Sequence, residues 1–338
     1  MAEGSIPPSG DWLLPGLIDL HVHGIGTAES TGERPTALAE MALALLQAGT
    51  TAFLATSSSD PDARLEDSLS RSLSFRNDQM CGKREEAELL GWHLEGPFLS
   101  PQYRGAQPQE NLLPPSPDLL VRYQRWAEGT IRILTLAPEL LGAEELVKTA
   151  LRLGIQPSAG HSAAEEESAN QAFRWGVRRL THAFNAMPPL NSRHPGLIGA
   201  ALLDPRVSLE MIADGIHVHP LVLDLTYRLK GAQRLMLVSD GRGTSPGGRI
   251  DLWEDAARLP DGSLAGGSHP LLDGVRTMVE RVGVPLHQAV AMASLVPARM
   301  LALHDRIGSL AIGREATFLR LGADWRLLEV WQRGRRAL

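Results

Sequence analysis

The sequence has one cysteine, Cys81, in 338 residues, and it has no long apolar run. A single thiol excludes an internal disulfide and is typical of proteins from a reducing compartment. No stretch approaches the ~18 consecutive apolar residues of a membrane-spanning helix, so no membrane partner is expected. The first residues, MAEGSIPPSGDW, lack the basic and apolar regions of a signal peptide, which favours a cytoplasmic location.

Basic charge is also sparse. The chain carries 33 Lys and Arg against 39 Asp and Glu, a net charge of -6, and its densest basic group is the terminal RGRRAL. Proteins that bind nucleic acid present basic patches or stripes to the phosphate backbone. The sequence therefore predicts no nucleic-acid partner.

Short apolar, β-branched segments alternate with amphipathic helical segments, such as 35–49 and 163–176, along most of the chain. This alternation is typical of parallel sheets flanked by helices. The predicted strands cover residues 17–22, 50–56, 89–95, 131–137, 155–160, 178–184, 208–214 and 234–240. The pattern favours the α/β class and a (β/α)8 TIM-type barrel, with an open doubly wound sheet as the competing fold.

The pattern changes after residue 303, where short alternating segments are separated by glycines. This texture predicts a few antiparallel strands in a small β appendage. We therefore expect a short N-terminal segment (1–16), a catalytic barrel (17–302) and the C-terminal strands of a small domain (303–338). The Gly-rich segment 241–249 follows the last barrel strand and predicts a loop, either a mobile lid or a plain connector.

Ligand-type side chains lie near the C-terminal ends of five predicted strands. A closed barrel brings these strand ends to one point, whereas an open sheet does not. Imidazole nitrogens and carboxylate oxygens together are the donors that Zn²⁺ or Fe²⁺ sites use in hydrolases. The residues are His21, His23, Glu95, His161, His182 and Asp240. Together they predict a metal-dependent hydrolase.

The spacing of these residues suggests individual roles. His21 and His23 are two apart on a strand, so both side chains leave the same face. Asp19 shares that face and is a candidate to orient one imidazole. Asp240 ends the last strand, where a carboxylate can accept a proton from a metal-activated water, which makes it the best general base. His93 lies deeper than the ligands and is expected in the core or behind them.

The motifs resemble those of the N-acetylglucosamine-6-phosphate deacetylases, within the amidohydrolase superfamily. They occur in the same order along nearly the whole predicted barrel, and HLEGP and THAFNAM are specific to the deacetylase branch. The matching segments are PGLIDLHVHG (15–24), HLEGPFL (93–99), RGAQ (104–107), SAGHS (158–162), THAFNAM (181–187), RHPGLIGA (193–200), IADGIHV (212–218), LVSDG (237–241), SLAGGS (263–268) and RIGSLAIGREA (306–316).

The resemblance implies roles for these positions. Glu95, His161 and His182 would hold the metal common to the family, and His21 and His23 a second ion that only some members bind. Asp240 would be the general base and then the acid for the departing amine. The residues implied in substrate binding are Ala106, Gln107, Asn185, Ala186, Arg193, His217, Leu264, Ala265 and Gly266; of these, Asn185, Ala186, Arg193 and His217 would bind the sugar phosphate.

Three features depart from the family pattern. The family usually has a histidine at the position of Gln107, and that histidine is thought to polarise the scissile carbonyl. The N-terminal β segment is nearly missing before His21. The sequence LVSDGRGTSPGGR replaces the usual small residues after the base.

The resemblance implies a metal-dependent deacetylase that converts N-acetylglucosamine 6-phosphate to glucosamine 6-phosphate and acetate, with one or two Zn or Fe ions per subunit of a homodimer. One alternative is a deacylase for a related substrate, such as N-acetylgalactosamine 6-phosphate or an N-acyl amino acid. The other is a weakened homologue that only binds sugar phosphates.

Overall fold

The computed structural model describes residues 10–82, 85–243, 251–252, 256–260 and 262–338. The Gly-rich segment after the last barrel strand lies outside the described residues from residue 244 onward, and with it the expected lid or connector.

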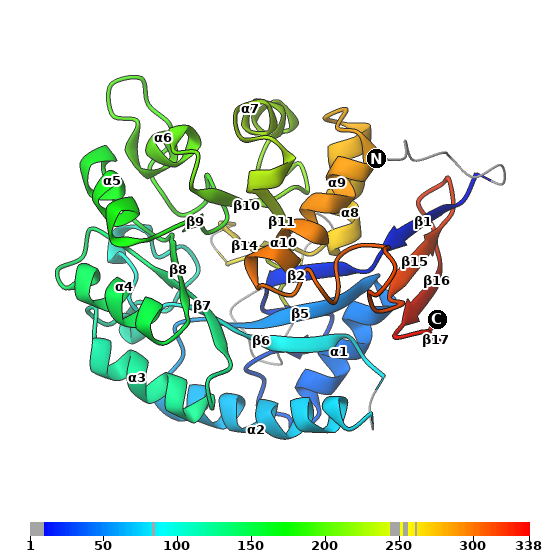
Figure 1. Ribbon diagram of the computed structural model, residues 1–338. Helices are drawn as coiled ribbons and strands as arrows, with labels where there is room; N and C mark the ends of the chain where they lie inside the picture. The colour runs from blue at the N-terminus through cyan, green and yellow to red at the C-terminus, as the bar shows by residue number, and fades with distance from the viewer. Residues whose placement is uncertain (1–9, 83–84, 244–250, 253–255, 261) are drawn as a thin grey trace.

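Eight parallel strands form one sheet, in the order β11-β10-β9-β8-β7-β6-β5-β2. The sheet curls so that its two edge strands meet (Figure 1). At this seam the Asp240 N–H donates to the His21 carbonyl at 2.9 Å, and the His23 N–H donates to the Gly241 carbonyl at 2.9 Å. The strands are β2 (Leu17–Val22), β5 (Thr50–Ser57), β6 (Glu88–Glu95), β7 (Ile131–Leu136), β8 (Gln156–Ala159), β9 (Arg179–Leu180), β10 (Ser208–Ile212) and β11 (Leu235–Val238). The predicted barrel is confirmed.

The sixth strand is much shorter than the predicted 178–184. β9 ends at Leu180 because the chain then enters a turn in which His182, Phe184 and Ala186 all have positive φ. Such backbone cannot continue a strand.

Helices cover the outside of the barrel (Figure 1). The two helical patterns predicted from sequence correspond to α1 and α5, which are followed by the positive-φ glycines Gly49 and Gly176. The helices are α1 (Ala37–Gln47), α2 (Asp62–Met80), α3 (Pro117–Trp126), α4 (Ala143–Arg152), α5 (Glu166–Trp175), α6 (Gly196–Leu203), α7 (Pro220–Lys230), α8 (Leu271–Glu280), α9 (Leu286–Met292) and α10 (Leu295–Met300), with short 3-10 turns η1 (Pro101–Tyr103), η2 (Gln109–Asn111) and η3 (Ala232–Arg234).

The apolar core has two parts. The larger one lies between the strands and the surrounding helices. The smaller one includes Ile18, Leu54 and Ile133 from three strands, packed with Val296 of α10. Both consist of buried apolar side chains, whose removal from water stabilises the barrel. The ligand-type residues lie at or near the C-terminal ends of the strands.

Four antiparallel strands form a separate sheet beside the barrel, in the order β1-β15-β16-β17 (Figure 1). The predicted C-terminal strands are confirmed, and the N-terminal β1 joins them. Their bounds are β1 (Trp12–Pro15), β15 (Phe318–Leu321), β16 (Leu327–Gln332) and β17 (Arg335–Arg336); the smaller strands are β3 (Gly24–Ile25), β4 (Ala28–Glu29), β12 (Asp251–Leu252), β13 (Ala257–Arg258) and β14 (Leu264–Gly266). The expected domain boundaries stay a prediction.

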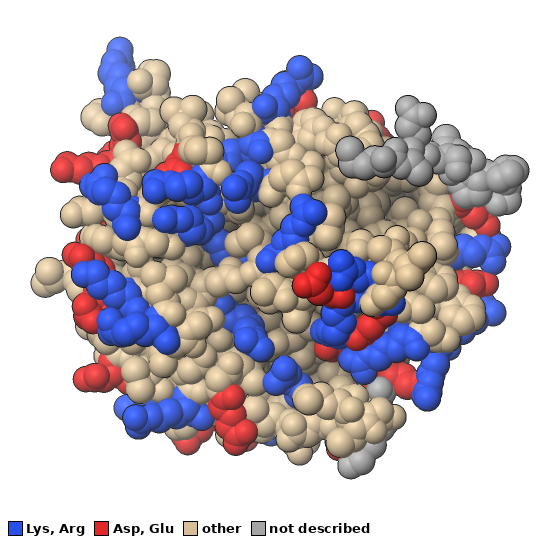
Figure 2. Space-filling model, viewed as in Figure 1, with Lys and Arg blue, Asp and Glu red and all other residues tan. Residues whose placement is uncertain are grey.

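Among the described residues, no helix combines the length and apolar character needed to cross a membrane. Figure 2 shows Lys and Arg side chains interspersed with Asp and Glu on one face of the molecule. The expectation of no nucleic-acid partner stays a prediction.

Candidate metal centre

The first cluster joins the ends of β6, β8 and β9. The Nε2 atoms of His161 and His182 lie 3.2 Å and 3.0 Å from Oε1 of Glu95, and the two nitrogens are 3.0 Å apart. All three side chains are buried. The structure therefore brings together the three residues that the sequence predicted as the main metal ligands.

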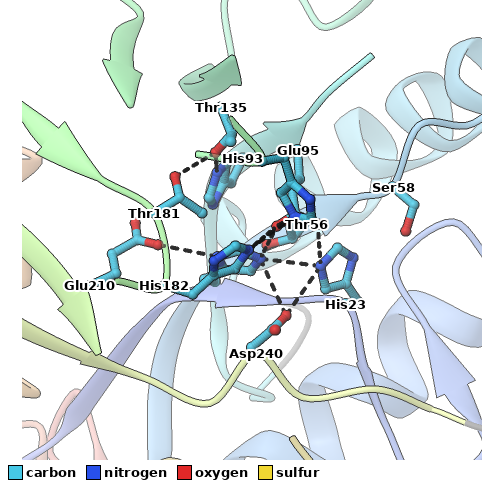
Figure 3. Close-up of polar contacts among 12 residues, drawn as sticks. His23, Thr56, Ser58, His93, Glu95, Thr135, Thr181, His182, Glu210 and Asp240 are labelled. Carbon is cyan, nitrogen blue, oxygen red and sulfur yellow. Dashed lines mark hydrogen bonds and ion pairs between the residues drawn. The ribbon is translucent and has the colours of Figure 1, made fainter. Parts of the chain in front are cut away.

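The second cluster joins β2 to the end of β11. The Nε2 atoms of His21 and His23 are 3.2 Å apart and lie 3.3 Å and 3.4 Å from Oδ1 of Asp240. Glu95 faces both clusters, because its Oε1 is 3.2 Å from His21 Nε2 and its Oε2 is 3.2 Å from His23 Nε2. Figure 3 shows the side chains of His23, Glu95 and Asp240 converging on one point from different strands.

The backbone is strained where it presents these residues. His161, His182 and Asp240 have φ values of 47°, 26° and 46°. Left-handed backbone costs a non-glycine residue of order 1–3 kcal/mol and is concentrated at functional sites. The rest of the barrel maintains this strain, and it directs the three side chains into the clusters.

A register shift between Asp19 and Val22 interrupts β2. Bulges of this kind change where the following side chains point. The Asp19 carboxylate binds the backbone N–H of His21 and the hydroxyl of Ser239 rather than an imidazole. The predicted role of Asp19 in orienting a histidine ring is therefore wrong.

Glu210 orients His21 instead. Its Oε2 lies 3.2 Å from Nδ1 of His21, and its Oε1 accepts a hydrogen bond of 2.6 Å from Arg179. All three residues are fully buried. Sequence reasoning missed Glu210 and Arg179 because both lie inside predicted strands. The only signal was that charged residues stand in otherwise apolar strands, where they need partners.

His93 packs against the ring of His21, with centroids 4.5 Å apart. Its Nδ1 lies 3.1 Å from the Leu20 carbonyl and its Nε2 lies 2.7 Å from the Thr135 hydroxyl, so neither nitrogen is available to a metal. Burial, with the charge of His21, lowers the pKa of His93 to about 3, which keeps it neutral. His93 lies behind the ligands, as predicted.

The donor atoms suit a divalent cation. Imidazole nitrogens that face each other at about 3 Å cannot all be satisfied by hydrogen bonds, whereas a cation between them uses every lone pair. The buried Oδ1 of Asp240 has no hydrogen-bond partner in the described part of the chain. Burial would raise the pKa of Asp240, but the charge of His21 and the nearby ring of His23 outweigh it and lower the pKa. These residues can therefore hold one or two metal ions.

Gln107 is buried against the first cluster, next to the half-buried Ala106. Its side-chain oxygen accepts a hydrogen bond of 2.7 Å from the Ser59 N–H, and its amide nitrogen donates to Oε2 of Glu95. The amide oxygen thus anchors Gln107 on Ser59, and the amide nitrogen orients Glu95.

The predicted sugar-pocket residues adjoin the clusters. β14 is joined to the strand end at Asp240, whose carbonyl accepts a backbone N–H at 2.8 Å just after β14. Asn185 and Ala186 are half-buried in the strained turn that begins at His182.

The two predicted phosphate ligands differ in setting. Arg193 is exposed on the loop before α6. The ring of His217 is buried; its Nδ1 lies 2.6 Å from Asp214, and its Nε2 has no hydrogen-bond partner among the described residues. Within the described part of the chain, no contact joins either residue to the metal clusters.

Replacing Glu210 with Gln should weaken metal binding at the second cluster about 10- to 100-fold, the usual effect of losing a partner behind a metal-ligating histidine. A neutral amide orients the His21 ring less strongly than a carboxylate. Chelator competition would measure the affinity. Glu88→Gln is the matched control, because Glu88 also binds an arginine, Arg306, but begins β6 at the far end of the barrel. Unchanged affinity in the Glu210 variant would refute the assignment.

This chain resembles known proteins along nearly its whole length. The amidohydrolase family model matches residues 12–329. The N-acetylglucosamine-6-phosphate deacetylase of Bacillus subtilis (strain 168) is 34% identical, over 97% of this chain and 85% of that protein. The N-acetylgalactosamine-6-phosphate deacetylase of Escherichia coli O157:H7 is 33% identical, over 96% and 87%. The crystal structure of the N-acetylglucosamine-6-phosphate deacetylase of Thermotoga maritima matches with a TM-score of 0.87 and 30% identity, over 100% and 91%.

These matches extend over the barrel and the small sheet together. They agree with the geometry, since amidohydrolases depend on metal and the described residues form buried clusters that can hold it. The chain therefore belongs to the amidohydrolase family.

Proposed function

We propose that this chain is a deacetylase that hydrolyses N-acetylglucosamine 6-phosphate to glucosamine 6-phosphate and acetate. The observation that carries the proposal is the convergence of Glu95, His161 and His182 with a buried carboxylate, Asp240, in a chain whose relatives are amino-sugar-phosphate deacetylases. This combination supplies both a metal site and a base for amide hydrolysis.

The metal is proposed to be Zn²⁺ or Fe²⁺, with one ion at Glu95, His161 and His182 and a second at His21 and His23. A bound divalent cation would polarise the acetyl carbonyl and make water a better nucleophile. Support for the second ion comes from Glu95, which contacts the histidines of both clusters.

Asp240 is the proposed proton carrier. Asp240 is ionised at neutral pH, and its buried Oδ1 has no hydrogen-bond partner among the described residues, so it can accept a proton from the attacking water. The same proton then passes to the nitrogen as the amide C–N bond breaks. β14, which lies beside Asp240, is the proposed wall of the sugar pocket.

The 6-phosphate is proposed to bind Arg193 and His217, with help from the turn at Asn185 and Ala186. Asp214 occupies Nδ1 of His217, which leaves the buried Nε2 to meet a ligand. Arg193 offers a guanidinium fork, whose charge and geometry suit phosphate oxygens.

Arg193→Ala should raise KM for the phosphorylated sugar by at least about tenfold, because a charge-assisted hydrogen bond is worth about 1.5–3 kcal/mol. Turnover of the unphosphorylated sugar should hardly change, since that substrate never uses the contact. Arg206→Ala is the control, because Arg206 is exposed between α6 and β10. Equal losses on both sugars would mean that Arg193 supports the fold or the metal site.

The epimer N-acetylgalactosamine 6-phosphate is a second candidate substrate, favoured by the 33% identity to the Escherichia coli deacetylase named for it. Acetate release from both epimers, with and without the phosphate, would decide between them. Equal wild-type activity with and without phosphate would leave only a general N-acyl hydrolase, and no activity on any would favour a binding protein. The cytoplasmic location and the homodimer stay predictions.

A further inference from the structure

Arg242 reaches the metal centre from the segment directly after the base. Its Nη2 lies 3.9 Å from Oε2 of Glu95, and its side chain is only 10% exposed. Nε donates a hydrogen bond of 3.0 Å to the Ala265 carbonyl, and Nη1 donates one of 2.8 Å to the Ser58 hydroxyl. Two sides of the guanidinium are therefore held by β14 and by the end of β5. Figure 3 places Ser58 across the cluster from Glu210.

The neighbouring strand is shaped around this side chain. Gly266 has a φ of +126°, and a Cβ built there would lie 2.6 Å from Cγ of Arg242 and 2.6 Å from the Asp240 carbonyl oxygen. No larger residue fits without displacing the arginine or the base. The absence of a side chain at Gly266 thus leaves the space that Arg242 occupies.

Arg242 and Gln107 approach the same oxygen of Glu95. Gln107 is neutral, and its amide is committed to Glu95 and Ser59. Arg242 carries a permanent positive charge. The 3.9 Å between Nη2 and Oε2 exceeds hydrogen-bond length, so the contact acts through charge and does not use up an N–H.

We propose that Arg242 is a catalytic residue that donates a charge-assisted hydrogen bond to the acyl oxygen of the substrate as that oxygen becomes negative. This inference rests on the proposed deacetylase function. A rigid donor aimed at developing charge in a buried site is among the strongest catalytic devices. Arg242 has the charge, the anchoring and the position beside Asp240 and Glu95 that this role requires.

The chemistry balances without any further reactant. Water oxygen bonds to the acyl carbon, its proton goes to Asp240, and the carbonyl π electrons move to the oxygen that Arg242 faces. When the C–N bond breaks, those electrons return to the carbonyl and the nitrogen takes the proton from Asp240. Arg242 keeps all its protons throughout.

The test compares N-acetyl and N-trifluoroacetyl glucosamine 6-phosphate. The fluorine atoms already polarise the carbonyl of the trifluoroacetyl group. Hydrolysis of that substrate therefore depends less on stabilisation by the protein. Arg242→Met should lower kcat/KM on the acetyl substrate by about 10²-fold or more, the scale of a lost oxyanion donor. The loss on the trifluoroacetyl substrate should be smaller by about tenfold. Arg242→Lys, which keeps the charge, should give an intermediate difference.

Arg306→Met is the matched control, because it removes an arginine held by Glu88 and Glu315 at the far end of β6. It should leave the ratio between the two substrates unchanged. Equal losses on both substrates in Arg242→Met, at normal metal content, would overturn the role of Arg242. If that variant does not fold, a ratio in Arg242→Lys equal to that of the wild type would overturn it. Failure of the wild type on both substrates would instead refute the deacetylase function.

Discussion

Asp240→Asn should lower kcat by about 10²- to 10⁴-fold, the range for a lost general acid–base. Asparagine keeps the size and shape of the side chain but cannot take a proton from water or return it to the leaving nitrogen. Both halves of the reaction lose their proton carrier, so the effect should fall on kcat more than on KM. Steady-state kinetics with acetate detection would measure it.

The metal content of the first cluster should stay largely normal in the Asp240 variant, because the described ligands of that cluster do not include Asp240. Asp224→Asn is a control for the substitution itself, because Asp224 is a half-buried residue of α7 that pairs with Arg228. Near-normal kcat in the variant would mean that another residue is the general base. Loss of metal would mean that Asp240 is chiefly a metal ligand.

Glu95→Ala should remove metal from both clusters and abolish detectable turnover. Glu95 contacts His161 and His182 on one side and His21 and His23 on the other. Burial would raise the pKa of Glu95, but the charges of His21 and His161 lower it well below its usual range, so it is a strong anionic ligand. Elemental analysis of the purified variant would measure the loss.

His182→Ala is the informative comparison, because His182 belongs to the first cluster alone. It should release the first ion and leave the ion at His21 and His23 largely in place. Metal content that is unaffected in a Glu95→Ala, His182→Ala double variant would contradict the assignment of the ligands.

Much of the fold and the ligand set could be predicted from sequence because both follow from periodic patterns. Buried parallel strands appear as short apolar runs, and a closed barrel brings their C-terminal ends together. Ligands such as Glu95 and His182 stand out because charged or titratable side chains end these runs. The same logic gave the C-terminal strands of the small sheet.

The rest depends on geometry that no local pattern carries. The Asp19 carboxylate is taken up by the His21 N–H and the Ser239 hydroxyl, so the expectation that it orients one imidazole was wrong. Glu210 is 189 positions from His21 in the chain and was unrecognisable as its partner. In the sequence, Arg242 was only part of a segment that departs from the family pattern. Its hydrogen bonds to Ser58 and Ala265 depend on the fold, which brings segments distant in sequence together.

The most direct test of the account is turnover of N-acetylglucosamine 6-phosphate by protein stripped of metal and then reloaded. The purified protein should release acetate and free amine in equal amounts. This release should stop after chelation and resume when Zn²⁺ or Fe²⁺ is added back. Return should require about one ion per chain, bound at the first cluster. Full turnover by the stripped protein, or no turnover at any metal loading, would contradict a metal-dependent deacetylase.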